Sequence, residues 1–229
     1  MKSFSCSCLL WCAAVVVQAV PVVRYTPVDR TAMAPVEQAG PLASASDFTR
    51  GWGLQRGYDP GFGSMGFNTS QTLAQAEEMG DYFEFSITIG AGYQLQLDEL
   101  GLSYRRTSGS ADHAALAFSR DGFAEESLVI DPFPLPAGTQ ALSFDLKHTG
   151  LPGFGIHEEP VTLSVRVYAW AESGGTRMGE LVFQPPESGS GGAFYLEGSF
   201  RHVPEPATVS LALGLGAMVW VGLRRRRDR

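Results

Sequence analysis

Beyond residue 12 the chain of 229 residues contains no cysteine, because Cys6, Cys8 and Cys12 are the only ones. A disulfide scaffold or a cysteine-ligated zinc site in the body of the protein is therefore excluded. Lysine is almost absent as well, with Lys2 and Lys147 the only two. The formal net charge of −7 argues against nucleic acid as a partner, since its phosphates repel an acidic surface.

Catalytic and metal-binding signatures are missing too. The histidines show no HExxH spacing, and no G-x-S-x-G nucleophile elbow occurs. Adjacent acidic residues such as Glu125 and Glu126 would point to opposite faces of a strand, so they do not make the carboxylate pair of a glycosidase. We therefore predict no enzyme activity, no metal and no cofactor. Calcium is left open, because the loop at 119–122 offers oxygen ligands, although a simple turn explains the same residues.

The N-terminus is typical of a secretory signal peptide over residues 1–19. Lys2 supplies positive charge, residues 9–17 are apolar and uncharged, and small residues stand before a cleavage site after Ala19. The apolar run is too short to span a hydrocarbon core about 30 Å thick. A lipoprotein signal ending at Cys12 is the alternative, but the residue before that cysteine is not small.

Three features follow one another at the C-terminus: a Pro-Glu-Pro triplet, an uncharged apolar run over residues 207–223, and an arginine cluster. The run is at the short end of the length that crosses a bilayer. Guanidinium groups resist translocation, so we predict one transmembrane helix with the cluster in the cytoplasm and residues 20–203 outside it. A buried core helix is the alternative, but such a helix would show a polar face. The triplet and the cluster consist of Pro204, Glu205, Pro206, Arg224, Arg225, Arg226 and Arg227.

Triplet, helix and cluster resemble the PEP-CTERM protein-sorting signal of Gram-negative bacteria, over residues 203–229. The resemblance implies processing near the triplet by exosortase, a membrane-embedded cysteine transpeptidase. It also implies an exported protein, anchored in the inner membrane before processing and then placed in the outer envelope, at the cell surface or outside the cell. Its host bacteria typically make extracellular polysaccharide and form biofilm, which makes exopolysaccharide a further expected partner.

Between its two ends the chain is predicted to be all-β. Residues 20–46 contain four prolines and little periodicity, which predicts a linker. From residue 47 onward apolar and polar residues alternate, most strictly over 83–89 and 161–170. We predict an antiparallel β-sandwich over residues 47–203, jelly-roll-like because it is too long for an immunoglobulin domain and lacks the Cys–Trp–Cys hallmark. Further strands are expected at 93–97, 100–104, 115–118, 128–130, 141–146, 178–183 and 193–200, and a short helix at 72–79.

The two longest alternating segments also predict which side chains are buried. One residue in two should face the core, while Glu84 and Ser164 should face outward. The expected core residues are Phe83, Phe85, Ile87 and Ile89 in the first segment and Val161, Leu163, Val165 and Val167 in the second.

A sandwich that binds glycans needs exposed aromatic side chains. Trp52, Tyr58, Phe62 and Phe67 cluster in a glycine-rich region and predict such a glycan-binding platform, with a packed, glycine-lined β-arch as the alternative. The body also resembles a recurrent PEP-CTERM ectodomain, which implies a lectin-like jelly roll without assigned activity. The segments that carry this resemblance are 81–85, 92–98, 117–123 and 165–170.

These observations predict a non-catalytic protein of the cell surface or extracellular matrix. A secreted lectin-like carbohydrate-binding protein, or a glycan-active enzyme on the same sandwich, is the alternative. Two close carboxylates on a concave face would favour the enzyme, whereas a flat aromatic strip would favour the lectin.

Overall fold

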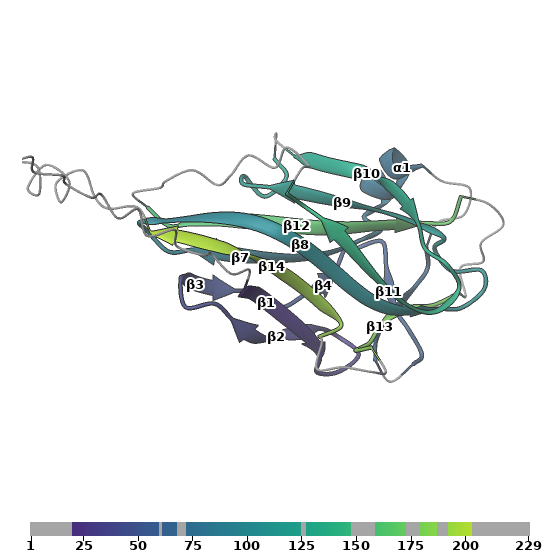
Figure 1. Ribbon diagram of the computed structural model, residues 1–229. Helices are drawn as coiled ribbons and strands as arrows, with labels where there is room; N and C mark the ends of the chain where they lie inside the picture. Colours follow the sequence, from purple (N-terminus) through teal and green to yellow (C-terminus); the bar gives the residue numbers. More distant parts are fainter. Residues whose placement is uncertain are drawn as a thin grey trace, which may run out of the picture.

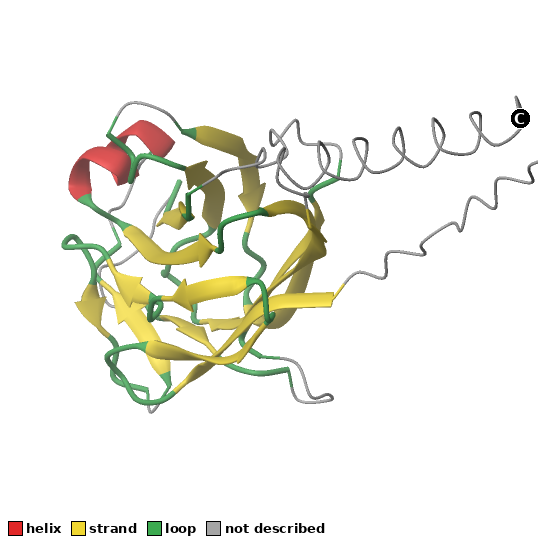
Figure 2. Ribbon diagram, turned by 90° about the vertical axis from the view of Figure 1, so that its left-hand side faces the viewer, coloured by secondary structure: helices red, strands yellow, loops and turns green. Residues whose placement is uncertain are grey.

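Two antiparallel β-sheets pack face to face, which confirms the predicted sandwich (Figure 1). The computed structural model describes residues 20–59, 61–67, 72–124, 127–147, 159–172, 179–186 and 192–202. Figure 2 shows the short helix α1 (Leu73–Met79) outside the strands. The predicted helix is therefore confirmed as well.

The eight-stranded sheet is built around the long strand β8. The strand order is β2-β1-β14-β8-β13-β6-β5, and β11 pairs with β8 as well. The C-terminal strand β14 thus lies inside the sheet, between β1 and β8. The strands are β1 (Val20–Pro27), β2 (Met33–Gln38), β5 (Gln55–Arg56), β6 (Phe62–Met65), β8 (Tyr93–Arg106), β11 (Gly138–Asp145), β13 (Leu181–Phe183) and β14 (Phe194–His202).

The six-stranded sheet has β12 and β7 at its centre. Its order is β10-β9-β12-β7-β3, and β4 pairs with β7 as well. Because β12 and β7 are the two segments with the strictest alternation, this pairing places two apolar faces side by side over the core. The strands are β3 (Leu42–Ala45), β4 (Thr49–Arg50), β7 (Tyr82–Ile89), β9 (His113–Ser119), β10 (Leu128–Pro134) and β12 (Val161–Trp170).

The predicted core faces of β7 and β12 are confirmed with one exception. All four β7 residues and three of the four β12 residues are at most 2% exposed. Val161, at the start of β12, is only half-buried. Ser164, expected to face solvent, is buried, because it lies between Ser86 and Ser119 on the two neighbouring strands.

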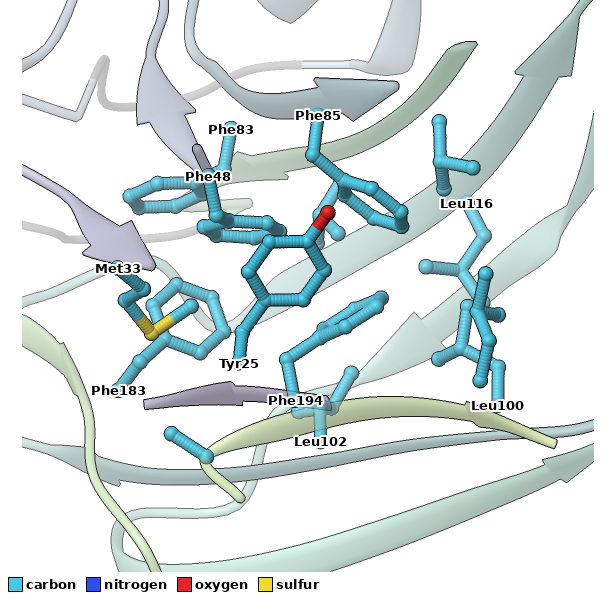
Figure 3. Packing of buried hydrophobic residues seen from close by; sticks show 14 of the residues in the cluster. Tyr25, Met33, Phe48, Phe83, Phe85, Leu100, Leu102, Leu116, Phe183 and Phe194 are labelled. Atoms are coloured by element: carbon cyan, nitrogen blue, oxygen red, sulfur yellow. The ribbon is translucent and has the colours of Figure 1, made fainter. Parts of the chain in front are cut away.

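Aromatic rings from both sheets fill the centre of the core (Figure 3). Phe48, in the short connection between β3 and β4, lies in the middle of this cluster. Six other rings have their centroids between 5.1 and 6.0 Å from that of Phe48, within the range of favourable aromatic pairs. These rings belong to Tyr25, Phe62, Phe83, Phe85, Phe183 and Phe194.

The linker predicted at 20–46 is wrong: this segment forms β1, β2 and β3 of the sandwich. Val22, Val23 and Tyr25 have no exposed surface, and β1 pairs with both β14 and β2. Two register shifts within β1 break the period-two pattern. Proline has no backbone N–H, but the four prolines of this segment lie where few hydrogen bonds between strands are lost. One lies beside a register shift, one at the end of β1, one in the edge strand β2 and one just before β3.

Arg50 ties the same N-terminal region to β6. Its guanidinium donates to Ser64 Oγ at 2.7 Å, to the Gly63 carbonyl at 2.7 Å and to the Arg30 carbonyl at 2.5 Å. It also lies 4.3 Å from the centroid of the Phe62 ring. Burial, aided by the charge of Arg56, lowers the pKa of Arg50 to about 10.

Residues 20–46 should therefore be indispensable for folding. We expect a chain of residues 20–203 to unfold in one cooperative thermal transition, because β1 buries Tyr25 in the shared core. A chain of residues 47–203 should show no such transition and no near-ultraviolet circular dichroism signal. Equal melting temperatures for the two chains would show that β1 to β3 are dispensable.

The alternation of buried and exposed side chains along β12 gives a second test of the fold. Val165→Asp places an unpaired charge in the core and should cost more than about 4 kcal/mol, enough to unfold most domains. Thr162→Asp, at an exposed position of the same strand, should change the free energy of unfolding by less than about 1 kcal/mol. Urea melts of residues 20–203 measure both, and similar losses would contradict the assigned faces.

Candidate functional site

The sorting tail begins where the last strand ends. His202 is the final residue of β14 and pairs with Tyr93 at the start of β8. Val20, the first residue of β1, pairs with Gly198 in the middle of β14, so the first and last strands of the described chain are neighbours in the sheet. Among the described residues no helix is long and apolar enough to cross a membrane.

The predicted residues of the two targeting segments lie outside the described residues. They are Ala19, Pro204, Glu205, Pro206, Arg224, Arg225, Arg226 and Arg227.

The predicted glycan-binding platform does not form as one surface. Phe62 and Phe67 are at most 1% exposed, so assigning them to a surface is wrong. Phe62 pairs in register with Phe183, and both rings point into the core. Trp52 and Tyr58 are 72% and 67% exposed, so of the four predicted residues these two lie at the surface.

The Trp52 loop is shaped by its contact with α1. A Cβ added at Gly80, the helix C-cap with φ of 72°, would overlap with the Trp52 indole. Added Cβ atoms at Gly51 or Gly53 would overlap with backbone at the end of the helix. The Gly-Trp-Gly sequence thus serves the docking of this loop onto α1.

Tyr58 belongs to a loop that a buried carboxylate holds in place. Glu180 is 7% exposed and accepts hydrogen bonds from the backbone N–H groups of Tyr58 and Asp59. The Asp59 carboxylate in turn pairs with Arg105 of β8. The loop is therefore fixed against the eight-stranded sheet.

A second candidate site, which the sequence analysis missed, lies on the outer face of the eight-stranded sheet. We call it the tyrosine face and define it by Tyr195 and Glu197 of β14, Glu99 of β8, Ser143 of β11 and Arg24 of β1. Register brings these residues from four adjacent strands together, and register was not visible from the sequence.

The Tyr195 ring lies across β8 at Gly101. Tyr195 pairs with Gly101, where an added Cβ would overlap with ring atoms Cε1 and Cζ. The phenol donates a hydrogen bond of 2.6 Å to Oε1 of Glu99, and the Ser143 hydroxyl donates one of 2.7 Å to the same oxygen. The glycine thus makes room for a ring that is held at its hydroxyl end.

Acidic residues form a row across this face. Asp145, Glu99 and Glu197 stand directly opposite one another on β11, β8 and β14. Arg24 offsets part of this charge, because its guanidinium lies 3.6 Å from Glu197 and 3.3 Å from Glu37.

The hydrogen bonds of the tyrosine face shift the pKa values of Glu99 and Tyr195 in opposite directions. The bonds from Tyr195 and Ser143 lower the pKa of Glu99. Burial, together with the bond to Glu99 and the charges of Glu99 and Glu197, raises the pKa of Tyr195 to about 12. Near neutral pH the face therefore holds a carboxylate beside a neutral phenol.

In the loop at 119–122, for which calcium was left open, the Ser119 hydroxyl and Oδ1 of Asp121 form hydrogen bonds within a turn. The Ser119 hydroxyl donates to Asp121 at 2.6 Å and accepts from the N–H of Phe123 at 2.8 Å. The described ranges contain no group of three or more His, Cys, Asp or Glu side chains placed to hold a metal ion.

Comparison with known proteins identifies the tail. Residues 202–227 match the PEP-CTERM protein-sorting motif, which confirms the predicted sorting signal. The motif implies an exported protein that exosortase sorts to the cell envelope. No curated protein matches the chain.

Two solved structures similar to the sandwich are carbohydrate-binding modules. One is CBM29_1, a family 29 module from Piromyces equi, with 10% identity, a TM-score of 0.36, and coverage of 80% of this chain and 90% of that chain. The other is TmCBM61 in complex with β-1,4-galactotriose, with 8% identity, a TM-score of 0.21, and coverage of 53% and 65%.

The lowered pKa of Glu99 predicts how stability depends on pH. A carboxyl whose pKa is lower in the folded than in the unfolded state stabilises the fold above its unfolded pKa and loses that effect as pH falls through the folded value. Glu99→Gln should therefore cost up to about 1 kcal/mol at neutral pH and less in acid. Thermal melts of the variant and the native chain from neutral to acidic pH test this, and a difference that grows in acid would contradict it.

Proposed function

We propose that this protein is a non-catalytic component of the cell surface or exopolysaccharide matrix. A signal peptide over residues 1–19 directs its export and is cut after Ala19, and a helix over 207–223 anchors it in the inner membrane. Exosortase then cuts near Pro204–Pro206 and passes the jelly-roll-like ectodomain to the outer envelope or the medium.

The match of residues 202–227 to the sorting motif carries this proposal. The motif starts at His202, the last residue of β14. A cut beyond that residue removes none of the strands that the structure describes, so the processed ectodomain keeps the core built from them. This position supports a tail that serves sorting.

The tyrosine face favours binding over catalysis. A glycosidase needs a carboxyl with a raised pKa as its general acid. Glu99 has the opposite property, since two donors stabilise its charged form. A flat aromatic ring beside a carboxylate and a hydroxyl suits sugar binding, so a lectin-like role is the second candidate function.

Fractionation tests the sorting part of the proposal. In a Gram-negative host without exosortase, the full chain should appear in the membrane fraction, because nothing cuts the anchor. A chain that ends at Val203 should appear in the soluble periplasm.

Two further chains control this experiment. Changing all four residues Arg224–Arg227 to lysine keeps the positive charge and should leave the chain in the membrane, whereas changing them to glutamate should disturb its topology. Equal solubility of the full chain and the chain ending at Val203 would overturn the anchor.

A further inference from the structure

The tyrosine face is an open surface in the part of the chain that the structure describes. Helix α1, the one helix among the described residues, packs on β12 of the other sheet. The side chains of Arg24 and Glu197 are 23% and 29% exposed, so a ligand lying on the ring would reach them. The face is thus available to a molecule that lies along the sheet.

The ring and Glu99 supply two complementary contacts. The Tyr195 ring rests on Gly101 and is only half-buried, so part of the ring is exposed to the C–H face of a pyranose. Both hydrogen bonds that reach Glu99 end on Oε1, so among the described residues Oε2 is unoccupied. A carboxylate beside an aromatic face also suits an ammonium group.

Charge selects among sugars. The row of Asp145, Glu99 and Glu197 is negative, and Arg24 and Lys147 offset only part of it. The whole chain has a net charge of −7. Polymers of uronic acid would be repelled, and polymers of protonated amino sugars would be attracted.

We propose that the tyrosine face binds a polysaccharide whose amino sugars carry free ammonium groups. The ring of Tyr195 stacks on a sugar, and Glu99 accepts a hydrogen bond from its ammonium group. This inference rests on the carbohydrate-binding role proposed above and adds its site and its ligand class.

Calorimetric titration of the full chain tests this directly, in a detergent without sugar head groups and in mildly acidic buffer. The probes are oligosaccharides of glucosamine, of N-acetylglucosamine, of glucose and of a uronic acid. We expect the glucosamine oligomer to bind at least about tenfold more tightly than the acetylated and neutral ones. The uronic acid oligomer should not bind.

Variants then locate the site. Tyr195→Ala should weaken glucosamine binding about tenfold, whereas Tyr195→Phe keeps the ring and should stay within about threefold of the native chain. Glu99→Gln should remove the preference for glucosamine over its acetylated form. Trp52→Ala, at an exposed aromatic residue away from the tyrosine face, is the matched control and should change nothing. Because Tyr195→Ala uncovers Gly101, a thermal melt must show that the Tyr195→Ala chain is folded. If it is not folded, the binding measured with Glu99→Gln tests the site instead.

The outcomes separate this inference from the proposed function. Loss of binding in Trp52→Ala instead of Tyr195→Ala would overturn the tyrosine face and leave a carbohydrate-binding role in place. Equal binding of acetylated and free glucosamine oligomers would overturn the ligand class. No binding of any oligosaccharide would overturn this inference and the carbohydrate-binding role together, while the sorting signal would still be judged by fractionation.

Discussion

Phe48 occupies the position on which the two sheets depend. It belongs to no long strand, yet rings from β1, β6, β7, β13 and β14 surround it. These strands come from the beginning, middle and end of the described chain, so the core forms only when all of them are present. With no cysteine beyond residue 12, this packing takes the place that disulfides hold in many exported domains.

The same constraint relates the fold to the export route. Strand β14 lies between β1 and β8, and the sorting motif follows it without an intervening linker. An exported chain can complete its larger sheet only after residues 194–202 have crossed the membrane. At that moment the Pro-Glu-Pro triplet is the next segment of the chain. The strand that completes the fold and the tail that carries the sorting signal are therefore adjacent along the chain.

The sequence predicted the strands whose alternation is unbroken. Strands β7 and β12 were predicted with nearly correct bounds, because the alternation of apolar and polar residues continues without interruption along each of them. Strand β8 was predicted as two strands, since the register shift near Asp98 moves the buried positions from Leu95 and Leu97 to Leu100 and Leu102. The N-terminal strands were missed for the same reason, with two register shifts in β1 and prolines at tolerated sites.

The candidate sites show a different limit. Tyr195, Glu99 and Ser143 are far apart in sequence, and only the pairing of β14, β8 and β11 brings them together. Composition favoured the aromatic residues around Trp52 instead, although the β6–β13 pairing turns Phe62 inward. The sorting tail was predictable because its three features are contiguous and need no tertiary contact.

Amide hydrogen exchange on the full chain in detergent most directly tests the central claim that residues 20–202 form one cooperative fold ending at the sorting motif. If the aromatic core joins the first and last strands, peptides covering 20–27 and 194–202 should exchange as slowly as those covering 82–89. Rapid exchange of residues 20–27 beside a protected β7 would contradict the account and return this segment to the role of a linker.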